Sequence, residues 1–245
     1  EARGNLDYLT GQPLTDVTDL PGAVADRSRR TLAAWLQDTW SHGRVTATGS
    51  LRFDALSDAE DGIAPRAALQ VDLGGGLDAR ALYSRGWRAP SFEELAFNLP
   101  GQLANPDLRS SVIDSGELAL TRRWHDGWVS ANAFWSRERD PIRLPAPFDP
   151  ALAQAWANVG DLTTRGLELE AQRGFGLDGS LFANLTWQQP RQETAGVEVD
   201  APGVPQVMAN VGLTLPVGRR LLVSPTLLWR GSRPRAAGDP RPELG

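Results

Sequence analysis

Residues 44–53 read Arg-Val-Thr-Ala-Thr-Gly-Ser-Leu-Arg-Phe, and polar residues alternate there with apolar or small ones. One face of an extended chain would hold Val45, Ala47, Gly49, Leu51 and Phe53, and the other face would hold Arg44, Thr46, Thr48, Ser50 and Arg52. The same rhythm recurs at 65–73, 77–87, 128–136, 165–172, 181–188, 207–215 and 221–230. We therefore predict an all-β protein of about ten strands, each with one apolar and one polar face.

The connections between the predicted strands are short and long in turn. The strands are expected at about 31–40, 44–54, 63–73, 77–87, 115–123, 128–138, 157–172, 180–188, 206–215 and 220–230. Short turns such as 74–76 and 125–127 follow the odd strands, and long loops such as 88–113 and 139–156 follow the even ones. Short periplasmic turns and long extracellular loops are typical of antiparallel up-and-down transmembrane β-barrels, so the even strands should run outward.

Each even strand carries an aromatic residue on its apolar face near its outer end. Aromatic residues gather at lipid–water boundaries, so these residues predict an aromatic girdle. The core of a soluble β-sandwich would explain less well why they all lie at the same end of the strands. The polar faces should line the barrel lumen, with Glu168 and Glu170 expected to meet arginines on neighbouring strands. The predicted girdle is Phe53, Tyr83, Trp87, Trp135, Trp187 and Trp229, and the lumen-lining set includes Arg52, Arg80, Glu168, Glu170, Asn184 and Asn210.

Composition excludes several other classes. The 245 residues include no cysteine, so disulfides and thiolate metal sites are excluded. No run approaches the roughly 18 apolar residues of a transmembrane helix. The net charge is −5, and the arginines form no basic stripe, which disfavours nucleic acid as a partner. The first residues do not resemble a signal peptide, so we expect the natural start to lie elsewhere.

Three possible chemical motifs are better explained structurally. The spaced glycines of 174–179 would bind a dinucleotide only if a helix followed, and a strand is expected there. The acidic pair Glu168 and Glu170 could suggest glycoside hydrolysis, but nothing else supports an enzyme. His42 and His125 both lie in short turns without partners at ligand spacing, so we expect no metal site and no cofactor.

Residues 89–95, Ala-Pro-Ser-Phe-Glu-Glu-Leu, should begin a short helix in the loop after the fourth strand.

Several stretches together resemble TonB-dependent outer-membrane receptors. The strongest is Tyr83-Ser-Arg-Gly-Trp-Arg-Ala-Pro-Ser-Phe-Glu-Glu-Leu95, followed by Asn105-Pro-Asp-Leu108 and Glu117-Leu118. Supporting pieces are Gln37-Asp-Thr-Trp40, Arg52-Phe-Asp54, Phe134-Trp135, Asp140-Pro-Ile142, Asn158-Val-Gly160, Arg165-Gly-Leu-Glu-Leu-Glu170, and Pro205 leading to Ala209-Asn-Val-Gly-Leu213. They occur in order over about 31–230, which makes the resemblance specific.

The resemblance implies a 22-stranded barrel with a plugged lumen in the bacterial outer membrane, surrounded by its lipid. It also implies energy supplied by TonB through an N-terminal segment, and import of a small scarce nutrient such as an iron–siderophore complex or cobalamin. This chain shows no plug and no TonB-contacting segment, so we expect an internal piece of the barrel's C-terminal half. We divide it into a polar loop at 1–30, a barrel segment at 31–230 and an extracellular loop at 231–245.

The ligand-contacting residues are the least constrained prediction. Arg88, Phe92 and Trp156 flank long outer loops, and we expect them to contact the ligand, with loop packing as the competing interpretation. Two other classes of protein stay open at this stage. One is a soluble carbohydrate-binding or hydrolytic β-sandwich, which needs two inner faces to close a core. The other is a passive porin-type or autotransporter barrel.

Overall fold

One large antiparallel sheet makes up most of the molecule. The computed structural model describes residues 28–98, 102–145, 154–176, 178–194, 196–218 and 220–235. The sheet has 12 strands along the order β1-β2-β3-β4-β6-β7-β11-β12-β14-β15, with β13 beside β12 and β16 beside β14. Most of the predicted loop at 1–30 and of the predicted loop at 231–245 lies outside the described residues.

The sequence forms the following elements. They are β1 (Thr31–His42), β2 (Val45–Leu56), β3 (Gly62–Gly74), β4 (Leu77–Arg88), α1 (Phe92–Ala96), β5 (Gln102–Leu103), β6 (Ser111–Trp124), β7 (Gly127–Arg139), β8 (Ile142–Arg143), β9 (Gln154–Ala155), β10 (Ala157–Asn158), β11 (Leu162–Phe175), β12 (Gly179–Thr194), β13 (Val197–Asp200), β14 (Val207–Val217), β15 (Leu221–Val223) and β16 (Thr226–Arg230). The ten long predicted strands correspond to β1–β4, β6, β7, β11, β12, β14 and the pair β15–β16.

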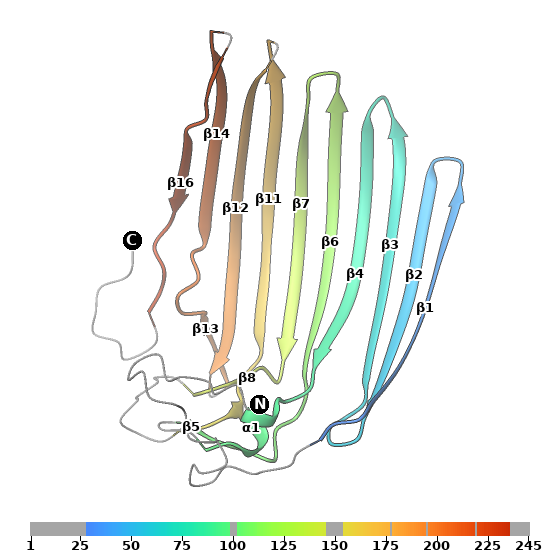
Figure 1. The fold of residues 1–245 in the computed structure, drawn as a ribbon, viewed down its shortest axis with the longest axis vertical. Helices are drawn as coiled ribbons and strands as arrows, with labels where there is room; N and C mark the ends of the chain where they lie inside the picture. The colour runs from blue at the N-terminus through green and yellow to red at the C-terminus, as the bar shows by residue number, and fades with distance from the viewer. Residues whose placement is uncertain are drawn as a thin grey trace, which may run out of the picture.

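The two ends of the sheet differ as the alternating connections predict. The tight hairpin turns lie together at the top of Figure 1, and α1, β5 and β8 lie at the opposite end. The turn after β3 contains Gly74, Gly75 and Gly76 with φ of 86°, 61° and 81°. This backbone region is disfavoured for residues that carry a Cβ atom, so the three glycines suit the turn.

Four predicted boundaries were wrong for identifiable reasons. The fifth strand begins at Ser111 rather than 115, because β4 and β6 continue to pair toward the loops. The seventh begins at Leu162, and residues 157–158 form the separate β10. The eighth strand was expected to end at 188, but β12 continues through Pro190 to Thr194 and forms a hairpin with β13. The tenth strand is interrupted at 224–225, where Pro225 carries no N–H for strand pairing.

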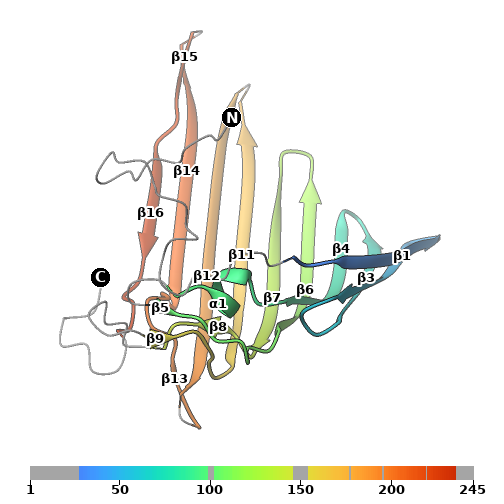
Figure 2. The ribbon, with the colours of Figure 1, turned by 60° about the horizontal axis from the view of Figure 1, so that its bottom comes forward.

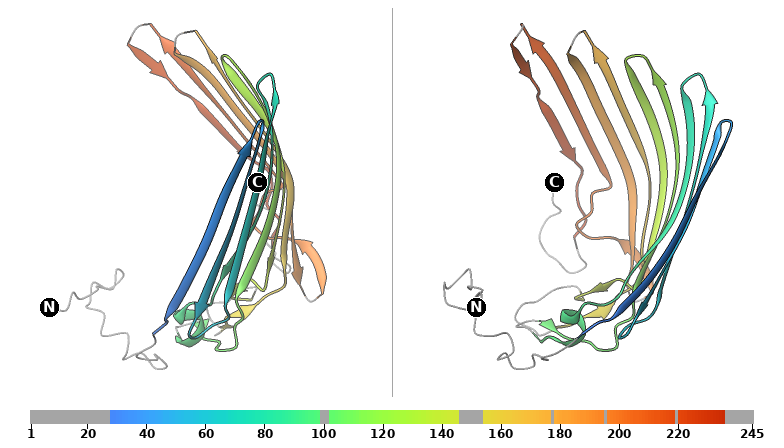
Figure 3. Two further views of the ribbon diagram at one scale, coloured as in Figure 1. Left: turned by 90° about the vertical axis from the view of Figure 1, so that its right-hand side faces the viewer. Right: turned by 45° about the vertical axis from the view of Figure 1, so that its right-hand side comes forward.

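The sheet is a single curved layer with two open edges (Figure 3). Its cross-strand register puts Phe53, Leu51 and Ala47 on one face, and Asp54, Arg52 and Ser50 on the other. In the described part of the chain, no second large sheet covers the apolar face, where Leu118 is 65% exposed. The β-sandwich alternative is therefore wrong, because a sandwich buries such a face between two sheets.

Among the described residues, no helix is both long enough and apolar enough to cross a membrane. Within the described ranges the one helix is α1, which occupies the loop after β4, where the sequence predicted a short helix. Ser91 is its N-cap and accepts a hydrogen bond from the backbone N–H of Glu94, while the Glu94 carboxylate accepts one from the Ser91 N–H. This reciprocal pairing is a capping box, which explains why so short a helix forms here.

Candidate functional site

The described loop residues at the end opposite the hairpin turns form a connected unit. We name it the loop platform; it comprises α1, β5, β8, β9 and β10 with the described residues that adjoin them. Figure 2 shows α1, β5, β8 and β9 grouped near the ends of the long strands. Two small pairings link distant parts of the platform: β5 with β9 in parallel, and β8 with β10 antiparallel. The β5–β9 pairing therefore joins the connection between β4 and β6 to the connection between β7 and β11, and the β8–β10 pairing lies within the second of these.

Glu94 attaches α1 to the end of β4. Its carboxylate Oε2 accepts hydrogen bonds from Arg88 Nη1 at 2.9 Å and from the backbone N–H of Ser91 at 2.7 Å. Burial of Glu94 acts to raise its pKa, but the hydrogen bonds from Arg88 and Ser91 outweigh it and hold the pKa below its ordinary value. Glu94 is therefore a buried, ionised anchor between the helix and the sheet.

Asn105 connects α1 to the segment that carries Trp156. The Asn105 backbone N–H donates to the carbonyl oxygen of Glu94, and its side-chain Nδ2 donates to the carbonyl oxygen of Trp156, both at 2.8 Å. The Trp156 N–H donates in turn to the carbonyl oxygen of Leu103. The indole Nε1 of Trp156 is buried and has no hydrogen-bond partner within the described residues. One asparagine thus ties together two loops about fifty residues apart.

Asn158 makes a second connection of the same kind. Its Oδ1 accepts a hydrogen bond from the backbone N–H of Arg109 at 2.8 Å, and its Nδ2 donates to the carbonyl oxygens of Arg109 and Asp140. Arg109 and Asp140 also form an ion pair. These bonds hold the connection between β4 and β6 against the connection between β7 and β11.

The three predicted ligand-contacting residues all lie on or beside the loop platform. Arg88 pairs with Glu94 and still exposes 49% of its side chain. The guanidinium carbon of Arg29 lies 5.3 Å from the centre of the Phe92 ring. Trp156 joins the same network through Asn105. The structure therefore places Arg88, Phe92 and Trp156 in one loop cluster, and their contact with a ligand stays a prediction.

The six predicted lumen-lining residues share the polar face of the sheet. Register pairs Arg80 with Gln70, Glu168 with Asn132, and Asn184 with Asn210. The hydrogen bond from Asn210 Nδ2 to Asn184 Oδ1 measures 2.8 Å. Register also places Arg52 and Glu170 on this face.

The prediction that Glu168 and Glu170 meet arginines on neighbouring strands was wrong. Glu168 accepts a hydrogen bond from Thr186, and among the described ion pairs none involves either glutamate. The strands next to Glu170 place Ser130 and Asn184 opposite it. Polar uncharged side chains therefore occupy the positions where arginines were expected.

The six predicted girdle residues lie on the apolar face by register, but one behaves differently. Phe53, Tyr83, Trp135, Trp187 and Trp229 are all exposed, at 39–51%. Trp87 is only partly exposed, because its ring packs against the backbone of Gly62. A Cβ atom at Gly62 would lie 1.5 Å from Trp87 Cε2. Trp87 thus fills the gap where β3 and β4 separate, and contact of the other five with lipid stays a prediction.

Sequence reasoning gave no individual role to Asn105 and Asn158, although both stand within stretches that carry the family resemblance. It also missed Asp114, which Tyr83, Arg85 and Arg139 surround. Gly174 lies in β11 and Gly179 begins β12, so a strand follows these glycines, whereas dinucleotide binding requires a helix there. No group of three or more His, Cys, Asp or Glu among the described residues is arranged to hold a metal ion.

Comparison with known proteins gives a consistent result. A family model described as "TonB dependent receptor-like, beta-barrel" matches residues 2–241. No match was found among curated protein sequences.

Solved structures share the fold at low sequence identity. The siderophore receptor PirA from Pseudomonas aeruginosa superposes with a TM-score of 0.71 at 20% identity, covering 86% of this chain and 39% of that protein. The ferric enterobactin receptor PfeA, also from Pseudomonas aeruginosa, gives 0.70 at 17% identity, covering 92% and 38%. The FrpB iron transporter from Neisseria meningitidis gives 0.58 at 14% identity, covering 82% and 32%. The chain thus spans less than two-fifths of the length of each of these proteins.

Proposed function

Because the chain belongs to the family of TonB-dependent receptor-like β-barrels, we propose that it forms part of the wall of a bacterial outer-membrane receptor that imports a scarce nutrient. An iron–siderophore complex is favoured over cobalamin, since the similar solved proteins are named as siderophore receptors and an iron transporter. The family and these neighbours are transport receptors rather than enzymes. In the complete receptor, TonB supplies the energy through a segment outside this chain.

The observation that carries this proposal is the loop platform at one end of a one-layered sheet. A continuous series of hydrogen bonds crosses the loops that connect these neighbouring strands; it runs through Arg88, Glu94, Asn105 and Trp156. Loops on a rigid β scaffold are a usual place for ligand binding. An Arg side chain that keeps half its area exposed suits an anionic ferric complex, and Phe92 and Trp156 supply aromatic surface.

The two faces of the sheet support a membrane location. The apolar face exposes large side chains over its whole width, including Leu51, Leu118, Leu167 and Leu227. Contiguous apolar surface on this scale is rare on monomeric soluble proteins and normal where lipid covers it. The polar face, with its Asn184–Asn210 hydrogen bond, would then line the lumen.

The test uses the full-length natural receptor in cells. Under iron limitation we expect it to take up one labelled ferric siderophore in cells with TonB and not in cells without it. Arg88→Gln should weaken binding of that siderophore by about tenfold, because a charge-assisted contact is lost. The matched control is Arg173→Gln, which removes an exposed arginine paired with Asp126 at the hairpin-turn end.

Uptake that is the same without TonB would indicate a passive porin-type barrel and overturn the transport proposal. Equal effects of Arg88→Gln and Arg173→Gln on siderophore binding would instead overturn the ligand role of Arg88 while leaving transport intact.

A further inference from the structure

Five arginines extend from the apolar face of the sheet at the end nearest the loop platform. Register places Arg85, Arg137 and Arg191 in one row across β4, β7 and β12. Arg165 lies one row nearer the hairpin turns, beside Trp135, and Arg139 lies one row nearer the loops. We name these five residues the arginine belt. Arg165 lies in the row that holds Tyr83 and Trp135, and the other four arginines lie on the loop side of that row.

The arginine belt has more arginines than carboxylates that form ion pairs with it. Asp114 accepts hydrogen bonds from both Arg85 and Arg139, Asp161 pairs with Arg137, and Asp200 pairs with Arg191. Arg165 donates to the neutral amide of Gln189. Four guanidinium groups therefore share three carboxylates in these ion pairs, and the fifth has a neutral partner. Their side chains stay accessible, since Arg137 exposes 51% and Arg139 exposes 42%.

An apolar slot lies on the hairpin-turn side of the arginine belt, between Tyr83 and Trp135. Gly116 is the register partner of both residues, on opposite sides, so no side chain fills the space between the two rings. The slot has a volume of about 560 Å³, and Ala67, Ala81 and Ala133 also line it.

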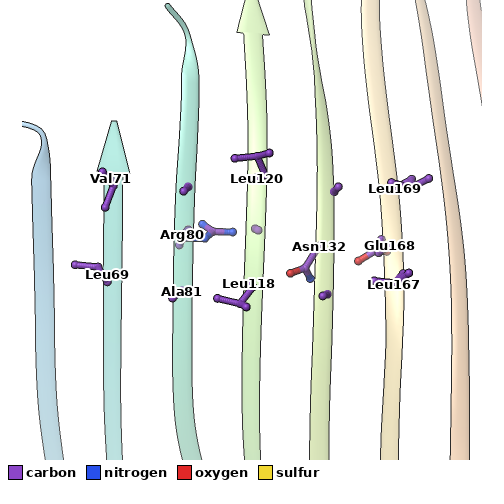
Figure 4. A pocket seen from close by; sticks show the side chains of 14 residues that line it. Leu69, Val71, Arg80, Ala81, Leu118, Leu120, Asn132, Leu167, Glu168 and Leu169 are labelled. Atoms are coloured by element: carbon purple, nitrogen blue, oxygen red, sulfur yellow. The ribbon is translucent and has the colours of Figure 1, made fainter. Parts of the chain in front are cut away.

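The slot continues toward the hairpin turns. It shares Leu69, Ala81, Leu118 and Ala133 with a second apolar hollow of about 490 Å³. Figure 4 shows this second hollow, with leucines projecting from the strands that carry Leu69, Leu118 and Leu167. The alternation of leucine-bearing and alanine-bearing strands thus leaves a long apolar furrow across the exposed face.

A polar pocket of about 430 Å³ lies at the loop side of the arginine belt. Arg85, Arg139 and Trp87 line it together with Ser110 and several carboxylates. Ser110 is 8% exposed, and its hydroxyl oxygen has no hydrogen-bond partner within the described residues. A pocket that offers both donors and acceptors suits hydroxyl groups better than a bare anion.

We propose that this face binds one acylated, phosphorylated glycolipid of the outer leaflet. An acyl chain occupies the slot between Tyr83 and Trp135, a phosphate contacts the arginine belt, and sugar hydroxyls reach the polar pocket. Arginine binds phosphate with paired hydrogen bonds, and aromatic rows mark the level where headgroups begin. The order along the strands, apolar slot then aromatic row then cations, follows the order of chemical groups in such a lipid.

The inference rests on the proposed outer-membrane location and does not depend on which nutrient is imported. The two tests are therefore separable. A receptor that fails to import a siderophore would still bind the glycolipid, and a receptor that fails to bind the glycolipid would still import its nutrient.

The test is a titration of the full-length natural receptor, purified in detergent and freed of lipid, with deep-rough lipopolysaccharide. The variant Arg137→Gln/Arg165→Gln leaves buried Asp114 and its two arginine partners in place. We expect it to bind lipopolysaccharide about tenfold more weakly. Gly116→Leu should also weaken binding, because the new side chain fills the slot. A Cβ atom there meets only the Leu82 carbonyl oxygen, at 3.9 Å, so the backbone accepts the change.

The matched controls make the same kinds of substitution elsewhere on the same face. Arg122→Gln/Arg173→Gln removes two arginines near the hairpin turns, and Gly49→Leu adds a leucine where nothing lies within 4 Å of a Cβ atom. Both should bind as the unmodified receptor does. Equal weakening by the controls, or unchanged binding by both test variants, would overturn the proposal. Equally tight binding of phosphatidylglycerol would overturn the assignment to a glycolipid.

Discussion

Tyr83 donates its hydroxyl hydrogen to Asp114 across the β4–β6 pair, with 2.6 Å between the two oxygens. Asp114 is 8% exposed and also accepts hydrogen bonds from Arg85 and Arg139. One carboxylate on the apolar face thus joins β4, β6 and β7 at the level where the aromatic residues give way to arginines.

Replacing Asp114 should loosen this junction. We expect Asp114→Asn to lower the free energy of unfolding by about 1–3 kcal/mol, because charge-assisted hydrogen bonds to two arginines become weaker or are lost. Tyr83→Phe removes one hydrogen bond and should cost less. Thermal unfolding of the full-length receptor in detergent measures both. An Asn variant as stable as the unmodified protein would contradict the structural role of Asp114.

Gly62 should tolerate no larger residue while Trp87 keeps its place. Gly62→Ala puts a Cβ atom inside the indole ring, so we expect a loss of about 1–3 kcal/mol in stability. Trp87→Ala should cost stability on its own by leaving a gap. Adding Gly62→Ala to Trp87→Ala should then cost little, since neighbouring sites are not additive. Gly49→Ala is the control, and additive losses at Gly62 and Trp87 would contradict the contact.

Acid should release α1 from the end of β4. Since the folded-state pKa of Glu94 is lowered, its stabilising contribution is complete above the ordinary glutamate range and is lost as the pH falls through the lowered pKa. Hydrogen exchange of the α1 amides in the full-length receptor should therefore rise on acidification beyond the intrinsic pH effect. Glu94→Gln should remove this dependence. A dependence that persists in the Gln variant would assign it to another group.

Asn158 should act on ligand binding through loop position. Asn158→Ala removes three hydrogen bonds that hold Arg109 and Asp140. We expect it to weaken siderophore binding by the full-length receptor while leaving thermal unfolding of the barrel nearly unchanged, because the strands do not depend on it. The matched change Asn132→Ala, in the middle of β7, should leave binding intact. Equal binding by the Asn158 variant would contradict the platform's role.

Local pattern was enough to predict the strands but not the platform. The alternation of apolar and polar residues predicts, without any tertiary information, that Val45, Leu69 and Ala81 share one face. The glycines at 74–76 mark the turn between β3 and β4. The capping residues Ser91 and Glu94 are likewise local, so α1 was predictable. Strand ends were harder, because Pro190 lies within β12 and Pro225 interrupts the last strand.

The site depends on contacts that no local pattern contains. Asn105 meets Trp156 from about fifty residues away, and β5 and β9 are two-residue strands that pair only because the long strands bring their loops together. The slot between Tyr83 and Trp135 likewise follows from the position of Gly116 in the register. Such features require the three-dimensional alignment of neighbouring strands.

The central claim is that this sheet spans the outer membrane, with the loop platform on the extracellular side and the hairpin turns on the periplasmic side. The chain contains no cysteine, so Asp107→Cys in the platform and His125→Cys in a hairpin turn introduce the only thiols of this segment. The measurement is labelling of the full-length receptor, cleared of any other thiols, by a membrane-impermeant maleimide on intact cells. We expect Cys at 107 to react and Cys at 125 to react only after the outer membrane is opened. Labelling of position 125 on intact cells would contradict the claim.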